Sequence, residues 1–320
     1  GKELDNRMLD FYYWQQYYTL MSNYGSYASY FIDTSTPFDQ QMCMFDDTRT
    51  WQQYFLQAAI TNYENVTAIW QEARLAGFQL SQEDQDYLDE LDGQITVAAA
   101  SYSYGSADEY LQMAYGPAAT LTSYHAFVER QITASAYLQV LVDEKPYTED
   151  DISKYYDDNA DSYAGNGIEK SDVKMVNVRH ILIQPEGKND DGTYTDEAWA
   201  EAEKKANDLL TEWQNGEHTE DSFAFMAAEN SQDPGSVENG GLYEDIYPGK
   251  MVDEFDAWCF DPARQPGDTG IVKTSYGYHI MYFSSTGEHA YWYVRAEEDY
   301  LNELSVSVLQ EVAAKFEVTE

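Results

Sequence analysis

The sequence is poor in cysteine, in basic residues and in long apolar runs, and each shortage excludes a class of protein. Only Cys43 and Cys259 occur in 320 residues, which rules out a disulfide-rich scaffold and a cysteine-rich zinc or iron–sulfur site. Lys and Arg number 18 against 58 Asp and Glu, for a formal net charge of −40, so nucleic acid and anionic membrane surfaces are poor partners. No apolar run reaches the roughly 18 residues that would span a bilayer.

The rest of the composition is that of a folded protein. With 43% hydrophobic and 15% aromatic residues, the chain is not a disordered acidic tail. Its length suits about one to three domains. Because it starts at Gly1 rather than at Met, we expect a trimmed sequence from which any signal or anchor segment has been removed.

The first half has the apolar periodicity of helices. Apolar residues recur at three- and four-residue steps over residues 51–73, and Gly77 ends the pattern. Pro117 is expected in the first turn of a later helix. The pattern predicts a helical domain over residues 1–170, with a flexible joint and a domain boundary at Gly165-Asn-Gly167.

The second half changes to alternating helices and strands. Residues 173–183 are rich in β-branched side chains at strand length, and residues 270–274 and 278–283 have the same character. Helical patterns separate them, together with a stretch at 231–249 that its glycines and prolines mark as a loop. This order predicts an α+β domain, followed by a further helix at residues 291–316.

Two of the five histidines, His180 and His279, lie inside apolar runs that resemble strands. A buried imidazole needs a hydrogen-bond partner, and histidine is uncommon at a strand centre. From the residues alone, the simpler interpretation is a pair of core histidines that have found their partners. The alternative is that the two form part of a functional site.

Six short motifs between residues 176 and 283 resemble, in their order, the parvulin family of peptidyl-prolyl cis/trans isomerases. Each motif is weak alone, and the ordered set is specific. They lie at 178–183 (Val-Arg-His-Ile-Leu-Ile), 223–231, 240–242 (Gly-Gly-Leu), 249–255, 266–268 (Pro-Gly-Asp) and 274–280.

The resemblance implies a four-stranded antiparallel sheet with surrounding helices, in which the first and last strands lie together at the centre. It implies that His180 and His279 are neighbours and that Thr274 hydrogen-bonds into the pair. It also puts the family's central polar residue on Asp233, although a plain turn is the alternative for an Asp before Pro-Gly. The implied activity is that of a parvulin-type peptidyl-prolyl isomerase, with His180, Asp233, His279 and Thr274 as the catalytic residues.

The resemblance also implies an apolar pocket for the proline ring, with Leu242, Met251 and Phe255 in its wall. One extra residue between Leu242 and Met251 leaves a further wall position open between Ile246 and Tyr247. The alternative for Met251 and Phe255, four residues apart, is that they are ordinary core residues.

Isomerisation of a prolyl bond needs neither a nucleophile nor a metal, so we expect no cofactor. The catalyst must bind the twisted amide better than either planar form, against a barrier of ~18–20 kcal/mol. We expect Asp233 near the rotating carbonyl, either as a repelling charge or as a protonated donor. Residues 184–193 hold one Lys and three acids, which would repel phosphate, so we expect phosphate-independent substrates.

The helical half resembles, more loosely, the chaperone region of PrsA- and SurA-type secreted foldases, best at residues 147–159. In that family the C-terminal helix returns to the helical domain, which gives three expected parts: a helical chaperone-like domain at 1–170, the parvulin domain at 171–287, and a returning helix at 288–320. The implied partners are unfolded or nascent exported polypeptides with X–Pro bonds. The implied location is extracytoplasmic, at the bacterial cell surface, where a lipoprotein or N-terminal anchor missing from this sequence would hold the protein on the outer face of the cytoplasmic membrane.

Two alternatives stay open. The tyrosines between Tyr12 and Tyr30 would either present a surface to apolar client segments or pack the helical domain, and exposed aromatics there would also suit a homodimer. The parvulin domain is either catalytic or only a peptide-binding module of a holdase. The presence of both histidines, Thr274 and Asp233 favours the enzyme.

Overall fold

The computed structural model describes residues 6–189 and 192–316, and the chain forms two compact units. One consists of Gly1–Pro146 with Leu301–Glu320, and the other of Tyr147–Tyr300. The domain boundaries expected at 170/171 and 287/288 stay a prediction. Within the described ranges, no helix has the length and apolar character needed to cross a membrane.

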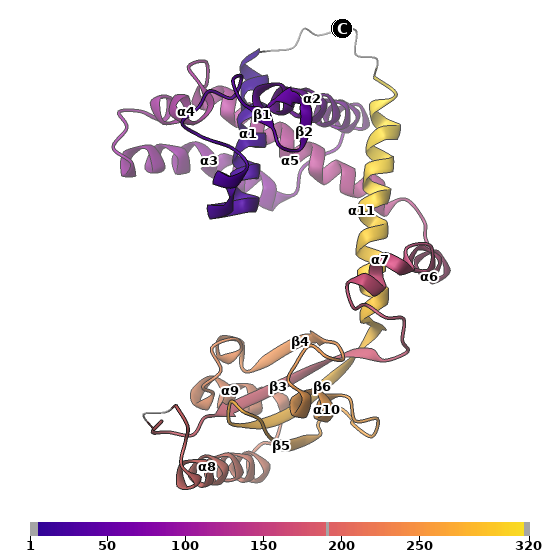
Figure 1. Cartoon of the computed structure of the whole chain (residues 1–320). Coiled ribbons are helices and arrows are strands. Elements are labelled where there is room, and N and C mark those ends of the chain that lie inside the picture. The colour runs from indigo at the N-terminus through magenta and orange to yellow at the C-terminus, as the bar shows by residue number, and fades with distance from the viewer. Residues whose placement is uncertain (1–5, 190–191, 317–320) are drawn as a thin grey trace. The chain divides into compact units, whose positions relative to one another are not determined.

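The first unit is helical, with one small hairpin (Figure 1). Its helices α1, α2 and α5 contribute to one apolar core, which contains Phe11, Tyr12 and Phe127. The elements are α1 (Asn6–Tyr24), the 3-10 helix η1 (Gly25–Tyr30), β1 (Met42–Cys43), β2 (Asp46–Thr50), α2 (Trp51–Ala76), α3 (Gln82–Ser101), α4 (Ala107–Tyr115), α5 (Leu121–Asp143) and the later part of α11 (Tyr291–Ala313).

Most helix limits in this unit follow from local sequence signals. The Thr50 side chain accepts a hydrogen bond from the backbone N–H of Gln53 at the start of α2, and Gly77 ends that helix with a left-handed φ of 70°. The expectation for Pro117 was wrong. Helix α5 starts at Leu121 instead, because Thr120 and Ser123 form the capping box there.

The second unit holds a four-stranded antiparallel sheet of order β4-β3-β6-β5. Its first and last strands in the chain, β3 and β6, are therefore central neighbours, as the resemblance implied. The elements are α6 (Glu149–Asp158), α7 (Ala160–Gly165), β3 (Lys174–Ile183), α8 (Asp196–Asn215), α9 (Glu220–Asn230), η2 (Val237–Asn239), β4 (Leu242–Ile246), α10 (Asp253–Cys259), β5 (Thr269–Lys273), β6 (Tyr278–Ala290) and the first part of α11.

Strand β4 corrects the interpretation of residues 231–249 as loop. It is five residues long, lies at the edge of the sheet and pairs only with β3. Its acidic pair Glu244-Asp245 interrupts any apolar alternation, so the strand depends on pairing rather than on local pattern. Helix α7 occupies Ala160–Gly165 and so includes the first residue of the expected flexible joint.

The sheet separates two apolar cores because alternate residues of a strand face opposite sides. On one side, Ile181 and Ile280 pack with residues of α8 and α9. On the other side, Val178 and Met281 pack with Phe255 of α10. His180 is two residues from Val178 in β3, and His279 is two residues from Met281 in β6. Because residues two apart in a strand face the same side, both imidazoles lie on the α10 side of the sheet.

Candidate active site

The two strand histidines lie against each other at the centre of the sheet. In the β3–β6 ladder His180 is opposite Met281 and His279 is opposite Leu182, so the two are diagonal neighbours on one face. Their rings stack at 5.2 Å, and their Nδ1 atoms are 3.0 Å apart. Both are buried, with exposed fractions of 2% and 5%.

A polar side chain extends this pair at each end. Thr274 Oγ1 lies 2.8 Å from His279 Nε2, and Asp233 Oδ2 lies 3.2 Å from His180 Nε2. Thr274, His279, His180 and Asp233 therefore form one continuous hydrogen-bonded chain, which we call the Thr–His–His–Asp chain. The structure brings all four predicted catalytic residues together, and their roles remain to be proposed below.

The hydrogen-bond network assigns the direction of the protons along this chain. A carboxylate accepts only, so His180 donates from Nε2 to Asp233, and its neutral Nδ1 accepts. His279 must then donate from Nδ1, which leaves its Nε2 to accept from the hydroxyl of Thr274. Thr274 Oγ1 also accepts from the backbone N–H of Tyr276 at 3.1 Å, which turns its own proton toward the imidazole.

Electrostatics agree with this assignment. Burial lowers the pKa of His279 to about 3 from its ordinary 6.5, with the neighbouring His180 as the second cause. His279 is thus neutral at physiological pH. The hydrogen bond from His180, followed by one from Ser236, holds the pKa of Asp233 well below its usual range despite partial burial. Asp233 is therefore an ionised carboxylate whose side chain is 17% exposed.

Asp233 is both a turn residue and a member of the site. Its backbone carbonyl accepts from Val237 N at 3.1 Å, which closes the turn through Pro234 and Gly235. The same turn brings the Ser236 hydroxyl to 2.6 Å from Asp233 Oδ2. The turn and the functional interpretations of this position are compatible, because the turn fixes the direction of the carboxylate.

Sequence reasoning missed two residues that hold this carboxylate, Ser236 and Tyr243. The Tyr243 hydroxyl donates to Asp233 Oδ2 at 2.9 Å, and its ring stacks on His180 at 5.2 Å. Burial, together with the bond to Asp233, raises the pKa of Tyr243 to about 12, so it remains a donor at physiological pH. Recognising β4 and its register would have revealed this residue, since Tyr243 is opposite Val178, two residues from His180.

Gly241 allows β4 to approach the site closely. The backbone N–H of His180 donates to the carbonyl of Gly241 at 2.8 Å. Gly241 has a left-handed φ of 75°, and a Cβ there would lie 2.2 Å from the carbonyl oxygen of His180. Only glycine satisfies both conditions without displacing the strand.

Two of the predicted wall residues, Phe255 of α10 and Met251 in the segment before it, belong to the apolar core on the side of the sheet that carries the histidines. Phe255 is 2% exposed, and its ring meets His180 and His279 edge-on, at 5.4 Å in each case. Met251 is partly buried and packs on the core that contains Phe255. Phe255 therefore borders the Thr–His–His–Asp chain, and Met251 lies against the same apolar core.

The other three predicted wall residues lie in different settings. Ile246 is fully buried in the core on the α10 side. Tyr247 stacks on Tyr291 at 3.7 Å. Leu242 pairs with Arg179 in the β3–β4 ladder, one residue before Tyr243. A substrate contact for any of the three stays a prediction.

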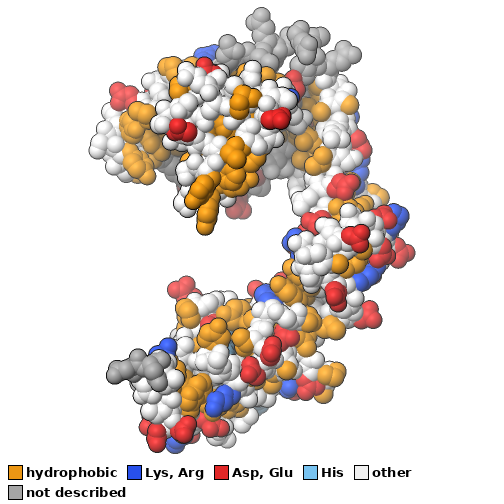
Figure 2. All heavy atoms as spheres, viewed as in Figure 1, with side chains coloured by type: hydrophobic (Ala, Val, Ile, Leu, Met, Phe, Trp, Pro, Cys, Tyr) orange, Lys and Arg blue, Asp and Glu red, His pale blue; other side chains and the backbone are white. Residues whose placement is uncertain are grey.

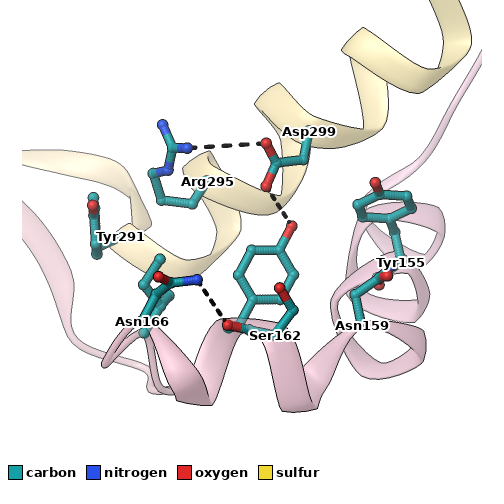
Figure 3. Close-up of a pocket in the computed structure, with 9 residues that line it drawn as sticks. Tyr155, Asn159, Ser162, Asn166, Tyr291, Arg295 and Asp299 are labelled. Atoms are coloured by element: carbon teal, nitrogen blue, oxygen red, sulfur yellow. Dashed lines mark hydrogen bonds and ion pairs between the residues drawn. The ribbon is translucent and has the colours of Figure 1, made fainter. Parts of the chain in front are cut away.

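A pocket of about 450 Å³ lies elsewhere in the same unit, between α6, α7 and α11 (Figure 3). Its polar groups largely engage one another: Tyr163 donates to Asp299 at 2.9 Å, and Asp299 lies 3.9 Å from Arg295. None of the predicted site residues lines it. Across the described part of the chain, no three His, Cys, Asp or Glu side chains are grouped to hold a metal ion, and a cofactor-free mechanism stays a prediction.

Comparison with known proteins assigns the domain that contains this site. Residues 166–285 match the family model described as the PPIC-type PPIase domain. These residues are a parvulin-type isomerase domain. They include all four members of the Thr–His–His–Asp chain.

Several curated proteins are similar to part of this chain. The foldase protein PrsA 1 of Listeria innocua is 31% identical over 106 residues, which are 33% of this chain and 29% of that protein. The foldase protein PrsA of a Geobacillus species is 44% identical over 80 residues, 25% of this chain and 27% of that protein. The chaperone SurA of Pseudomonas savastanoi is 35% identical over 107 residues, 33% of this chain and 22% of that protein. The matched region thus spans less than a third of each of these relatives.

Proposed function

We propose that this chain is a peptidyl-prolyl cis/trans isomerase and foldase that acts on unfolded exported polypeptides containing X–Pro bonds. The observation that carries the proposal is the Thr–His–His–Asp chain, because it joins, inside the isomerase domain, the four residues that the family resemblance implies. The similar proteins are a foldase or a chaperone by name, which supports the wider role.

The proposed catalytic step is noncovalent. In a planar amide, resonance places negative charge on the carbonyl oxygen, and twisting the C–N bond removes part of it. A fixed carboxylate beside that oxygen destabilises the planar forms more than the twisted one. The lowered pKa of Asp233 favours this repelling charge over a protonated donor, and each ~1.4 kcal/mol of preference for the twisted amide gives a tenfold faster rate.

The histidines act as positioning residues in this proposal. His180 holds the Asp233 carboxylate from the buried side, and His279 and Thr274 fix the tautomer of His180 through their own hydrogen bonds. Met251 and Phe255 would supply the apolar surface for the proline ring, with Leu242 and either Ile246 or Tyr247 as further predicted contacts. An apolar surface favours the less polar twisted amide as well as the ring.

We also propose that the substrates carry no phosphate before the proline. The stretch 184–193 offers Lys188 and Glu186, and its Asp190 and Asp191 lie outside the described residues. The Lys188 ammonium lies 5.3 Å from the ring of Tyr194. One lysine among three acids makes a poor phosphate site.

The proposed location is outside the cytoplasm at the bacterial cell surface. It rests on the resemblance to secreted foldases and on the names of the relatives. Attachment to the membrane through an N-terminal or lipid anchor, and a homodimer through the helical unit, belong to the same proposal.

An isomerase assay on a short X–Pro peptide tests the catalytic claim. We expect the full chain to speed cis-to-trans conversion, and Asp233→Asn to slow kcat/KM at least about tenfold, because the charge is lost while the size is kept. Asp221→Asn, an exposed acid of the same domain, is the matched control and should match the parent. A parent rate at background would refute the enzyme, and an Asp233→Asn variant as fast as the parent would refute the role proposed for the Asp233 charge.

A further inference from the structure

One end of the first unit carries large apolar side chains that are open to solvent. Tyr12 on α1 is fully buried, so the packing interpretation applies to it, whereas the tyrosines after the middle of α1 emerge from the core. We call the exposed set the aromatic–methionine patch. Its members and their exposed fractions are Tyr24 37%, Tyr27 67%, Tyr30 74%, Met42 55%, Met44 65% and Phe45 44%.

These side chains lie on the end of α1, on η1 and on the β1–β2 hairpin, and ring contacts join some of them in pairs. The ring of Tyr24 contacts Phe31 at 4.6 Å and Phe45 at 6.0 Å, and Tyr27 stacks on Tyr30 at 6.1 Å. Figure 2 shows apolar side chains gathered on the segment that follows α1 in Figure 1. Exposed large apolar side chains gathered on one part of a surface mark interaction sites on folded proteins.

The patch rests on a rigid base. Phe45 packs edge-on against Trp51 at 5.4 Å, and Trp51 is fully buried beside Phe55 and Ile32. Because the rings beneath are fixed, binding would not have to order them, which lowers its entropic cost. Methionine adapts to partners of different shape, and tyrosine offers an apolar face with a polar edge. The surface therefore suits apolar side chains without a fixed sequence.

The charge around the patch selects among such partners. Residues 20–50 contain four Asp and a single basic residue, Arg49. Arg49 is paired with Asp46 at 3.3 Å, and hydrogen bonds from Ser35 and Thr36 lower the pKa of Asp33. The surroundings are thus persistently negative, in a chain of net charge −40. They attract cationic segments and repel acidic ones.

We propose that the aromatic–methionine patch binds unfolded polypeptide segments whose apolar side chains are flanked by Lys or Arg. This proposal rests on the foldase function proposed above, and it concerns a surface in the other unit, separate from the isomerase site. In this proposal, the negative charge and the exposed aromatic side chains around the patch select the client segments, and a proline in the client is not required.

The test uses the full chain and proline-free fluorescent peptides, so that the isomerase site has no prolyl bond to bind. One peptide has a Leu- and Phe-containing centre with Lys flanks, and a second has the same centre with Glu flanks. The patch variant is Tyr27→Ser/Tyr30→Ser/Met44→Ser. The matched control changes equally exposed apolar residues elsewhere in the same unit: Leu75→Ser/Val97→Ser/Met113→Ser, at 79%, 67% and 72% exposed.

We expect the Lys-flanked peptide to bind the parent at least about tenfold more tightly than the Glu-flanked one, and to weaken with added salt. The patch variant should lose at least about tenfold in affinity, and the control variant should stay within about twofold. Equal binding by the patch variant and the parent, equal affinity for both peptides, or no binding by the parent would each overturn the proposal.

Two further measurements keep the interpretation unambiguous. Sedimentation of the parent and the patch variant detects self-association; a dimer that only the parent forms would mean that a second copy covers the patch, which overturns the proposal. The isomerase rate on a short X–Pro peptide should be the same in all three proteins, since none of the changed residues lies in that domain. An absence of isomerase activity in the parent would count against the proposed function, whereas the peptide affinities would still test the proposal for the patch.

Discussion

The Tyr243 hydroxyl lies 2.9 Å from Asp233 Oδ2 while its ring stacks on His180 at 5.2 Å. One side chain thus contacts both the buried histidine and the carboxylate that the histidine holds. Ser236 donates to the same oxygen at 2.6 Å. Three donors on one oxygen fix the carboxylate in place and favour its ionised form.

Tyr243→Phe tests the contribution of the tyrosine donor. The ring and its stacking remain, but Asp233 loses one hydrogen bond, so its pKa should rise toward the ordinary value. We expect kcat/KM at neutral pH to fall by about threefold to tenfold, because a hydrogen bond to a charged group is worth ~1.5–3 kcal/mol when fully buried and less here. The acid limb of the pH–rate profile should move to higher pH.

The matched control is Tyr276→Phe, which removes an exposed phenolic hydroxyl in the loop beside Thr274. It should leave both the rate and the pH profile unchanged. A Tyr243→Phe profile that overlays the parent would show that the hydroxyl does not act on Asp233.

The sequence predicted the four members of the Thr–His–His–Asp chain because His180, Thr274 and His279 lie in family motifs and Asp233 closely follows the motif at 223–231. Their adjacency needed the strand order, since His180 and His279 are 99 residues apart. The role of Tyr243 could not be predicted from the sequence, for a physical reason. Strand β4 is short and lies among turn residues, and a shift of one residue in its register would exchange Leu242 and Tyr243 between the two faces of the sheet.

In the helical unit too, some features could be predicted from the sequence and others could not. Capping residues such as Thr50 before α2 and Thr148 before α6 fix helix starts through local hydrogen bonds. Such signals are readable in the sequence, although at α5 the cap is Thr120 rather than the expected Pro117. The exposure of Tyr27 and the burial of Tyr12 depend on what packs around α1 and η1. Both residues are tyrosines, so the residue type does not show which one is buried; only the tertiary packing decides it.

The tautomers of the two histidines are directly measurable. The chain assigns the proton of His279 to Nδ1 and that of His180 to Nε2. Nitrogen-15 NMR of the full chain, with signals assigned through single His→Asn variants, should show these two different tautomers at neutral pH. A proton on Nε2 of His279 would reverse the chain and remove the assigned donor to Asp233.

Thr274→Val removes the hydroxyl that donates to His279 while keeping the side-chain shape. The buried Nε2 is then left without this donor, so we expect a loss of ~1–3 kcal/mol in the free energy of unfolding. Thr274→Ser keeps the hydroxyl and should recover most of the loss. Denaturant unfolding of the three proteins measures both effects, and equal stability of the Val and Ser variants would contradict the assigned bond.

Burial of neutral His279 makes the stability of the protein depend on pH. Its folded pKa of about 3 is below the ordinary 6.5, so between these values the unfolded chain binds the additional proton. The contribution is fully present above pH 6.5 and is lost as the pH falls toward 3, at ~1.4 kcal/mol per pH unit. His279→Asn should therefore flatten the fall in stability between pH 6 and 4.5 by about that slope. Parallel stability curves for the parent and the variant would show that His279 does not titrate in this way.

Gly235 offers a steric test of the same site, because a Cβ at this position would lie 2.6 Å from the Tyr243 hydroxyl. Its φ is not among the positive values of the chain, so alanine fits the backbone and only the tyrosine must move. We expect Gly235→Ala to break the bond between Tyr243 and Asp233 and to lower kcat/KM by about as much as Tyr243→Phe, ~threefold to tenfold. Gly165→Ala, where a Cβ meets nothing within 4 Å, is the control. The decisive comparison is the double variant: with phenylalanine at 243 the clash disappears, so Gly235→Ala should cost nothing further, whereas an equal loss in both backgrounds would mean that Gly235 acts on something other than Tyr243.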